Sequence, residues 1–381
     1  MAKNSKILTV WSWCKKEAVL SIAIILAIIS ALFVHPDKEY LGYIDFRTLA
    51  ILFCLMAVMA GVQQLGLFHY IAEKLLNCVK GIRSLVFLLI MLCFFSSMFI
   101  TNDVALITFV PFSFITLRLI LGKDTEKVII PVVVMQTVAA NLGSMLTPIG
   151  NPQNLYLYSK TDMNFIEFIR FMLPYTTIAF LMLAVWCLCF RHKSDGPVAV
   201  ILRSKTSLKG CEKKLAVYAV LFVLSLLAVA HVLPYEVVTI LILAVVFFMD
   251  KKVLKQVDYT LLLTFIGFFI FIGNMGRVPV FREFLQQIIV DNEILTGVAV
   301  SQFMSNVPAA LLLSGFTEQY KELIIGTNLG GLGTIIASMA SLISFKYIAG
   351  EYKHLRGRYL WHFTVVNIVF LVILLTFAIL D

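Results

Sequence analysis

Charged side chains are scarce in this sequence. Only 14% of the 381 residues are charged, with 22 acidic against 31 basic side chains, while 60% are hydrophobic. From Ser84 to Leu117 the single charged residue is Asp103. This balance excludes a soluble enzyme with one anchor and is typical of an all-α polytopic membrane protein.

The sequence also lacks the motifs of catalysis and metal binding. Its seven cysteines include no CxxC pair and no Cys/His cluster at metal-ligand spacing. It contains no nucleophile–base pair and no phosphate-binding loop. We therefore predict that the protein is not an enzyme and has no cofactor. Na⁺ at Asp103 is the one bound metal ion that the sequence suggests.

Long polar segments are almost absent. The net charge of +9 could indicate a nucleic-acid partner, but the basic residues stand in short loops, so membrane topology explains them better and no nucleic acid is expected. Placing the N-terminus in the cytoplasm puts most Lys and Arg residues inside. We predict a multi-pass protein of the plasma (inner) membrane, with residues 1–17 as an interfacial segment on the cytoplasmic side.

Apolar runs divide the rest of the chain into candidate spans. They are 18–34, 47–66, 128–158, 165–190, 215–233, 235–249, 259–277, 323–345 and 359–380. The one long polar linker, 191–214, is basic and is predicted to be a cytoplasmic connector. It separates a first membrane repeat, 18–190, from an extra helix at 215–233 and a second repeat, 234–381.

Two polar turns interrupt apolar sequence, one in each half. They are Thr101-Asn102-Asp103 and Ser305-Asn306-Val307-Pro308. An ionisable group in hydrocarbon costs at least ~2.5 kcal/mol, so Asp103 is expected to face protein or a water-filled cavity. The flanking stretches look too short for two full spans each. We predict two re-entrant helical hairpins, 84–121 and 293–317, whose tips lie near the middle of the membrane.

A second kind of interruption follows each hairpin. The run from Asn141 to Asn154 carries Pro148, Pro152, Gly143 and Gly150, which break a helix and free backbone carbonyls. Thr147, Asn151 and Asn154 can satisfy those carbonyls or hold an ion. The corresponding run in the second half is 326–334, with Thr327, Asn328 and four glycines. Both runs predict interrupted transmembrane helices.

The two halves share this order of features. Residues 60–66 resemble 272–276, and Ala140–Ser144 resembles Thr327–Gly331. The extra helix at 215–233 would invert the second half relative to the first. Inverted repeats with facing tips build a site near the midplane that can be exposed to either side in turn.

On these residues the chain resembles the ion transporter superfamily. That group includes divalent-anion/sodium symporters, citrate transporters, arsenite pump membrane subunits and one class of sodium/proton antiporters. The signatures are Thr101-Asn102-Asp103, the run Leu146–Asn154, and Ser305-Asn306-Val307-Pro308. The resemblance implies a homodimer in which a transport domain moves like an elevator against a scaffold. Dicarboxylate symporters have Ser-Asn-Thr at both tips; Asp103 is more similar to the arsenite and sodium/proton branches.

Together these features predict a cation-coupled secondary active transporter of a small anion, driven by Na⁺ or H⁺. The anion would be a di- or tricarboxylate or an inorganic oxyanion. Substrate binding is assigned to Asn102, Asn151, Asn306, Thr327 and Asn328. Cation coupling is assigned to Thr101, Asn102, Asp103, Thr147, Gly150, Asn154, Ser305 and Asn306. The alternatives are arsenite efflux, Na⁺/H⁺ antiport with Asp103 as the shared site and, more remotely, an ion channel.

Overall fold

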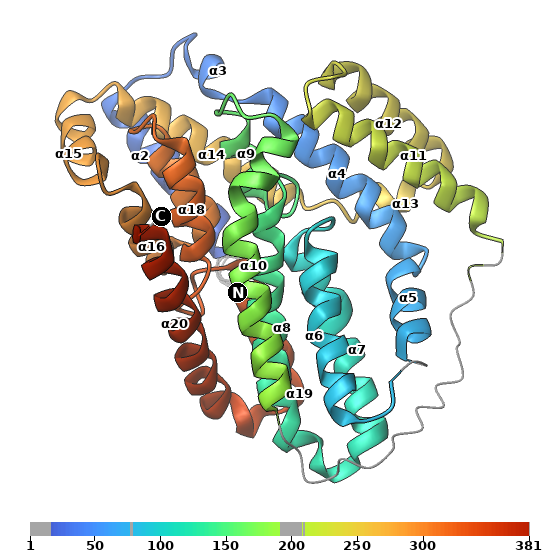
Figure 1. The fold of residues 1–381 in the computed structure, drawn as a ribbon. Coiled ribbons are helices and arrows are strands. Elements are labelled where there is room, and N and C mark those ends of the chain that lie inside the picture. The colour runs from blue at the N-terminus through green and yellow to red at the C-terminus, as the bar shows by residue number, and fades with distance from the viewer. Residues whose placement is uncertain (1–16, 77–78, 191–207, 209, 381) are drawn as a thin grey trace, which may run out of the picture.

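The computed structural model describes residues 17–76, 79–190, 208 and 210–380 (Figure 1). Most of the interfacial segment 1–17 and of the connector 191–214 lies outside these residues. Within them every regular element is a helix. The prediction of an all-helical chain is therefore confirmed for the described residues.

The helices follow the predicted spans closely. The first half contains α2 (Ala18–Phe33), α3 (Tyr40–Tyr43), α4 (Phe46–Gln64), α5 (Leu67–Leu76), α6 (Ile82–Ser97), α7 (Asn102–Leu121), α8 (Thr125–Gly143), α9 (Pro152–Tyr158) and α10 (Phe165–Cys189). The second contains α11 (Glu212–Val229), α12 (Tyr235–Met249), α13 (Lys251–Leu254), α14 (Tyr259–Gly276), α15 (Pro279–Ile289), α16 (Glu293–Met304), α17 (Asn306–Ser314), α18 (Tyr320–Gly330), α19 (Met339–Glu351) and α20 (Arg356–Leu380). Three 3₁₀ turns stand at 122–124, 144–146 and 353–355.

Length and composition make the chain a polytopic membrane protein. In the described residues, six helical segments are long and apolar enough to cross a membrane: Phe46–Gln64, Asn102–Leu121, Thr125–Leu146, Phe165–Cys189, Tyr259–Gly276 and Lys353–Leu380. Three shorter apolar helices, α2, α6 and α12, accompany them. Helix α20 leaves large apolar side chains exposed, as expected of a surface that faces lipid.

The length argument for the first hairpin holds for one of its two arms, because α6 has 16 residues and is shorter than a full span. The stretch around Asp103 looked too short for two spans, yet α7 alone has 20 residues, and at 1.5 Å per residue this reaches across the hydrocarbon core. Pro111 lies inside α7 without ending it. Length alone therefore does not identify the α6–α7 pair as re-entrant. In the second pair α16 has 12 residues and α17 only 9, and both are too short to span.

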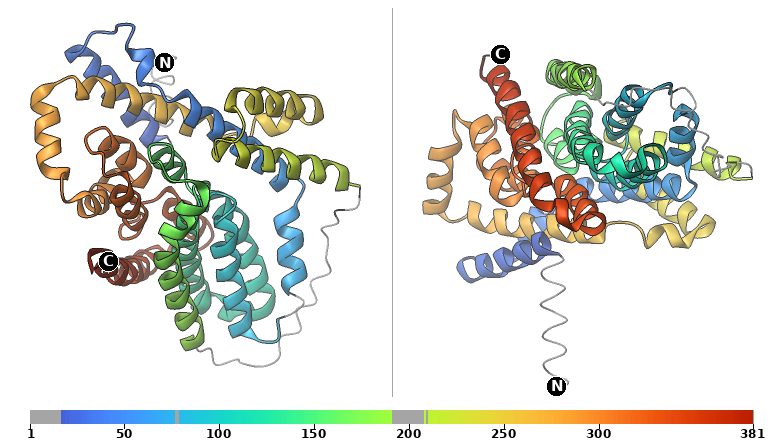
Figure 2. Two further views of the ribbon diagram at one scale, coloured as in Figure 1. Left: turned by 45° about the horizontal axis from the view of Figure 1, so that its top comes forward. Right: turned by 90° about the horizontal axis from the view of Figure 1, so that it is seen from below.

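The first helix of each half packs on the other half. Helix α2 lies beside α14 in both views of Figure 2, while α12 and α11 pack on α4. In Figure 1 α11 and α12 stand together at the upper right, beside α4. Their apolar side chains form a small core of their own, which includes Val58, Leu221 and Ile242, separate from the main core. We call this group of helices the α4–α11–α12 block.

Acidic side chains cap the two long helices that flank the bundle. Asp45 accepts a hydrogen bond from the backbone N–H of Thr48 at the start of α4, and Asp258 accepts one from Leu261 at the start of α14. Such caps satisfy backbone donors that the first helical turn leaves free. Helices α5 and α15, which follow α4 and α14, are both amphipathic.

Candidate functional site

The first tip is tied to the interruption between α8 and α9. Thr101 is extended, and Asn102 is the first residue of α7. The backbone N–H of Asn102 donates to the carbonyl of Gly150 at 3.3 Å, and its side-chain amide donates to Asn141 Oδ1 at 2.9 Å. The carbonyl oxygen of the Asn102 side chain accepts the backbone N–H of Asp103. The tip is therefore held by hydrogen bonds from α8 and from the segment before α9.

The second tip makes the corresponding backbone contact. The N–H of Asn306 donates to the carbonyl of Ala337 at 2.9 Å. Ala337 stands two residues before α19, as Gly150 stands two residues before α9. Ser305 is the N-cap of this arm, and Asn306 begins α17.

The backbone is strained at the second tip. Ser305 has φ +76°, a value that non-glycine residues rarely adopt, and its side chain is buried. Such a conformation costs about 1–3 kcal/mol and persists only where surrounding contacts impose it. The hydrogen bond of Asn306 to Ala337 is one such contact. Among the described residues, the hydroxyl of Ser305 has one hydrogen-bond partner, Asn306 Oδ1 at 3.4 Å.

The polar residues of the first interruption mostly satisfy freed backbone. Asn154 directs its side-chain N–H group toward the carbonyls of Ser144, Met145 and Thr147 at 3.3–3.4 Å. The hydroxyl of Thr147 donates to the carbonyl of Met98 at 2.6 Å. These bonds are required because neither lipid nor water is available to carbonyls buried in protein.

Asparagines join the two interrupted helices. Asn328 of α18 donates its side-chain N–H to Asn154 Oδ1 at 2.6 Å, and Asn151 approaches Asn328 Oδ1 at 3.5 Å. In the opposite direction Ser338, before α19, donates to Asn141 Oδ1 of α8 at 3.0 Å. All of these side chains are buried. The ends of α8 and α18 and the starts of α9 and α19 therefore meet in one polar network.

The predicted residues divide between this network and its surroundings. Asn102, Asn151, Asn154, Asn328 and the backbone of Gly150 take part directly. Asn306 packs beside Gly331, whose carbonyl accepts a hydrogen bond from Asn141. Thr327 is not part of the network, because its hydroxyl donates a hydrogen bond to the carbonyl of Leu323 in its own helix.

Three members of the network were absent from the predicted site: Asn141, Ser144 and Ser338. The repeated Asn-Leu-Gly of Ala140–Ser144 and Thr327–Gly331 was a signal for Asn141, since its counterpart Asn328 was selected. Ser144 and Ser338 carry no such signal. Ser144 accepts the side-chain amide of Asn151 at 2.7 Å only because the chain turns back between α8 and α9.

Asp103 lies apart from the asparagines, on a cavity of about 380 Å³. The cavity runs between α4, the start of α7 and the segment before α14. Its polar lining consists of Gln63, Thr101, Asp103, Gln256 and Asp258, and the other lining residues are apolar. The Oδ1 atom of Asp103 is buried and accepts no hydrogen bond from the described part of the chain. Of the two surroundings expected for Asp103, protein or a water-filled cavity, the structure shows a cavity.

These donors suit a monovalent cation better than a transition metal. In the described residues no three His, Cys, Asp or Glu side chains gather as a metal site would require. The free Oδ1 atom of Asp103, with nearby Thr101, offers hard oxygen ligands of the kind that Na⁺ accepts. A proton on the same carboxyl group is the other species that these residues fit.

Sequence comparison places this geometry among transporters. The profile of a family described as citrate transporter matches residues 7–319. An uncharacterised transporter of Methanocaldococcus jannaschii is 34% identical over 94% of this chain and 96% of its own. The inner membrane protein YbiR of Escherichia coli is 30% identical over 81% of this chain and 82% of its own. The silicon efflux transporter LSI3 of Oryza sativa subsp. japonica is 27% identical over 43% of this chain and 33% of its own. With its helices, its tips and this match over most of its length, the chain belongs to the citrate transporter family of membrane transporters.

Proposed function

We propose that the protein is a cation-coupled secondary active transporter of a small anion that works by alternating access. The observation that carries this proposal is the matched pair of tip contacts, Asn102 N–H to Gly150 and Asn306 N–H to Ala337. Each joins the start of a helix to the interruption of another helix. Broken helices that meet inside a bundle are how secondary transporters build a midplane site.

Reciprocal contacts support an inverted repeat. Asn141 and Asn328 each stand two residues before the end of α8 or α18, and each contacts the residue just before the short helix of the other half, Ser338 or Asn151. Two elements related by a twofold axis make such paired contacts, with i to j and j to i.

Two glycines extend the same pattern. Gly61 of α4 lies against the ring of Tyr218, and Gly273 of α14 lies against the ring of Tyr43. The exchange of α2 and α12 between the halves agrees with it. We propose that α6–α7 and α16–α17 are the two re-entrant hairpins of this repeat.

Helix starts favour an anionic substrate. Helices α7, α17 and α19 begin at or beside the buried network, and a helix start presents free N–H groups and the positive end of its dipole. Asn102, Asn151, Asn306 and Asn328 supply amide donors there. We propose that they bind the substrate, with Thr327 at the rim of the second half-site.

Asp103 is the proposed site of coupling. A carboxylate near an anion site repels the substrate unless a cation or a proton neutralises it, so the two would bind together. Thr101 supplies an oxygen beside Asp103. Thr147, Gly150 and Asn154 hold the backbone of the first interruption, and we propose that Ser305 and Asn306 contribute to coupling from the second tip.

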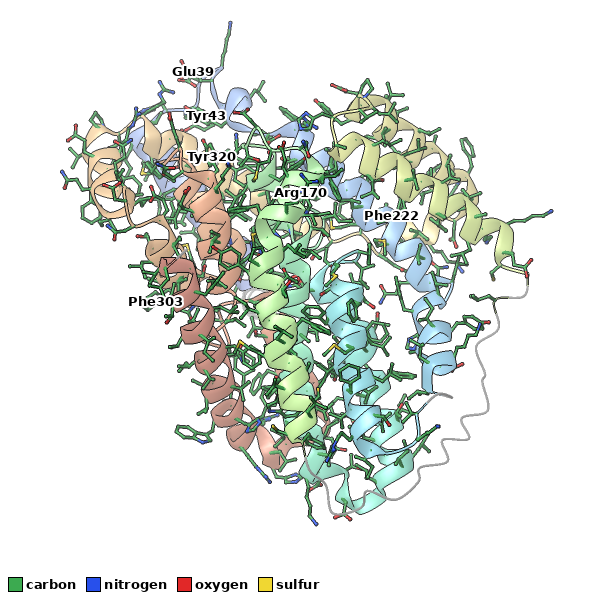
Figure 3. All side chains as sticks on the ribbon, in the orientation of Figure 1. Glu39, Tyr43, Arg170, Phe222, Phe303 and Tyr320 are labelled. Atoms are coloured by element: carbon green, nitrogen blue, oxygen red, sulfur yellow. The ribbon has the colours of Figure 1, made fainter. Side chains whose placement is uncertain are left out.

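Two separate cores are compatible with an elevator. The α4–α11–α12 block would stay fixed, and the hairpins with their interrupted helices would move. We also propose a homodimer, with the N-terminus and the 191–214 connector in the cytoplasm. Figure 3 places Glu39, Tyr43 and Tyr320 at one end of the bundle, which would then be the outer end. Cysteine labelling at Lys205 and at a C-terminal tag from opposite sides of the membrane would support this topology; labelling of both from one side would overturn it.

Asp103 also favours a second candidate, efflux of arsenite or a similar weak acid, or Na⁺/H⁺ exchange at Asp103 itself. The partial similarity to a silicon efflux transporter points in the same direction. No basic side chain lines the cavity beside Asp103, so a cation or a neutral acid would meet no electrostatic barrier there.

Transport by purified protein in liposomes distinguishes the candidates. Citrate, dicarboxylates, sulfate, arsenite and silicic acid would each be offered with an imposed Na⁺ or H⁺ gradient. Accumulation of one anion that depends on the gradient supports the main proposal. Exchange of Na⁺ for H⁺ without any anion supports the second candidate. Electrical conductance far above about 10³ ions per second would contradict both.

A further inference from the structure

A second carboxylate, that of Asp258, lines the same cavity as Asp103. Asp258 is exposed and lies at the mouth, just before α14, while Asp103 is partly buried deeper in, at the start of α7. The two are close enough for the charge of Asp258 to act on that of Asp103. Asp258 was not among the residues that the sequence pattern selected, because nothing local marks a helix cap as part of a distant site.

The lining of the cavity strengthens the electrostatic field of these two carboxylates. Its lining contains no Lys, Arg or His, and its only other polar members are Gln63, Thr101 and Gln256. A carboxylate pair walled by apolar side chains creates a stronger field than the same pair in water. Nothing in the lining neutralises that field.

Neighbouring groups offset part of the electrostatic field of the Asp258 carboxylate, which keeps its full charge. One of its oxygens, Oδ1, accepts the N–H of Leu261, and the positive end of the α14 dipole lies beside it. Lys251, Lys252 and Lys255 of the adjoining segment are exposed and do not line the cavity. The carboxylate therefore stays fixed in direction, with its second oxygen turned to no donor in the described residues.

We infer that Asp258 is a positioning residue for the coupling cation, which it attracts into the cavity and stabilises on its way to Asp103. This inference rests on the proposed function, since it assumes that a cation occupies Asp103. The inference also gives the side of entry: the cation enters the cavity from the membrane face at which α14 begins. Asp258 acts through charge alone and does not contact the substrate.

The test compares three substitutions at one position. Asp258→Asn and Asp258→Ser remove the charge but keep a good helix cap, whereas Asp258→Glu keeps the charge. In liposomes, the driving cation is titrated on the side from which this face is accessible. We expect Asn and Ser to raise the apparent KM for the cation about three- to tenfold with the maximal rate unchanged, and Glu to restore it. Added choline chloride should shrink the difference, because salt screens an exposed charge.

Asp250→Asn is the matched control. Asp250 also caps a short helix on the same surface, through Lys252, but it does not line the cavity. Binding is read independently as the rise in Tm of the purified protein with Na⁺ alone or, for a proton-driven protein, with falling pH. An unchanged cation KM in Asp258→Asn, or an equal change in Asp250→Asn, overturns the inference. Failure of the proposed coupling site is a different result, namely gradient-driven transport that survives Asp103→Asn. Failure of the proposed function itself would appear as no gradient-driven transport by the unaltered protein.

Discussion

Asn328 donates its side-chain amide to Asn154 Oδ1 at 2.6 Å, and both residues are buried where two interrupted helices meet. Each residue also donates hydrogen bonds to backbone carbonyls of its own half. Asn154 covers carbonyls freed between α8 and α9, and Asn328 donates to the carbonyl of Ile324. One contact between amides therefore links the helix breaks of both halves.

Asn328→Ala should weaken this link. The change leaves Asn154 Oδ1 buried without its donor, and an unpaired buried polar group costs about 1–3 kcal/mol. We expect a lower Tm in detergent and loss of transport. Asn292→Ala, at an exposed position before α16, is the control and should leave both unchanged. Wild-type stability in Asn328→Ala would show that the contact is dispensable.

Asp103→Asn should abolish gradient-driven transport without unfolding the protein. The amide keeps the shape and most hydrogen-bonding capacity but carries no charge and no titratable proton. Because the Oδ1 atom of Asp103 is unpaired, its neutralisation should keep or raise Tm. Uptake in liposomes and thermal unfolding are measured together, with Asp162→Asn in the exposed loop between α9 and α10 as control. Full activity would make Asp103 structural and return attention to the asparagines.

Gly150→Ala should prevent the first tip from docking. A Cβ atom at Gly150 would clash with the backbone of Ser144, which cannot move as a side chain could. Overpacking of this kind typically costs about 1–3 kcal/mol, and here it also displaces the carbonyl that accepts Asn102 N–H. We expect poor yield or a Tm clearly below that of Gly42→Ala, where a Cβ meets open space. Equal Tm values for the two variants would contradict the packing described.

Cysteines at the two tips should report access of water. Val104 lines the cavity, so Val104→Cys should react with a water-soluble thiol reagent, and bound substrate should protect it. Val307 is buried, so Val307→Cys should react only when transport conditions expose the second tip. The exposed Phe303 on α16 points away from the bundle (Figure 3), and Phe303→Cys is expected to face lipid and react slowly. Equal labelling at all three positions under every condition would indicate that neither tip is gated.

An ion pair at the proposed outer end should make stability depend on pH. Arg277 donates to Asp37 at 2.6 Å and to Tyr43 at 3.0 Å, and the hydrogen bond from Arg277 lowers the pKa of Asp37 below its ordinary value. A lowered pKa means that Asp37 contributes stability above its unfolded pKa and loses it as the pH falls through the folded value. Arg277→Gln should therefore lower Tm more at pH 7 than at pH 3. Asp37→Asn should reduce that difference to the part that Glu39 contributes, since Glu39 also lies 3.4 Å from Arg277. If Arg277→Gln has the same effect at both pH values, the hydrogen bond from Arg277 to Tyr43 accounts for the stabilisation.

The sequence by itself determined which segments become helices and where they break. Apolar runs, proline and glycine act locally, so α2, α4, α10, α12, α14 and α20 were predictable, as were both interruptions and both tips. The scarcity of charge made Asp103 conspicuous, because a lone acid in hydrocarbon must be accommodated. The pairing of Asn102 with Asn306 as tip residues came from the repeated order of features.

Only the tertiary structure decided which polar groups meet. Ser338 donates to Asn141, and Asp258 lines the same cavity as Asp103, because helices from distant parts of the chain pack together. The same packing turned Thr327 back to its own helix and made Ser305 the strained N-cap. Hydropathy reports the environment of each segment, not the partner that satisfies its polar groups. That partner is set by packing, since every buried donor must find an acceptor wherever the fold places one.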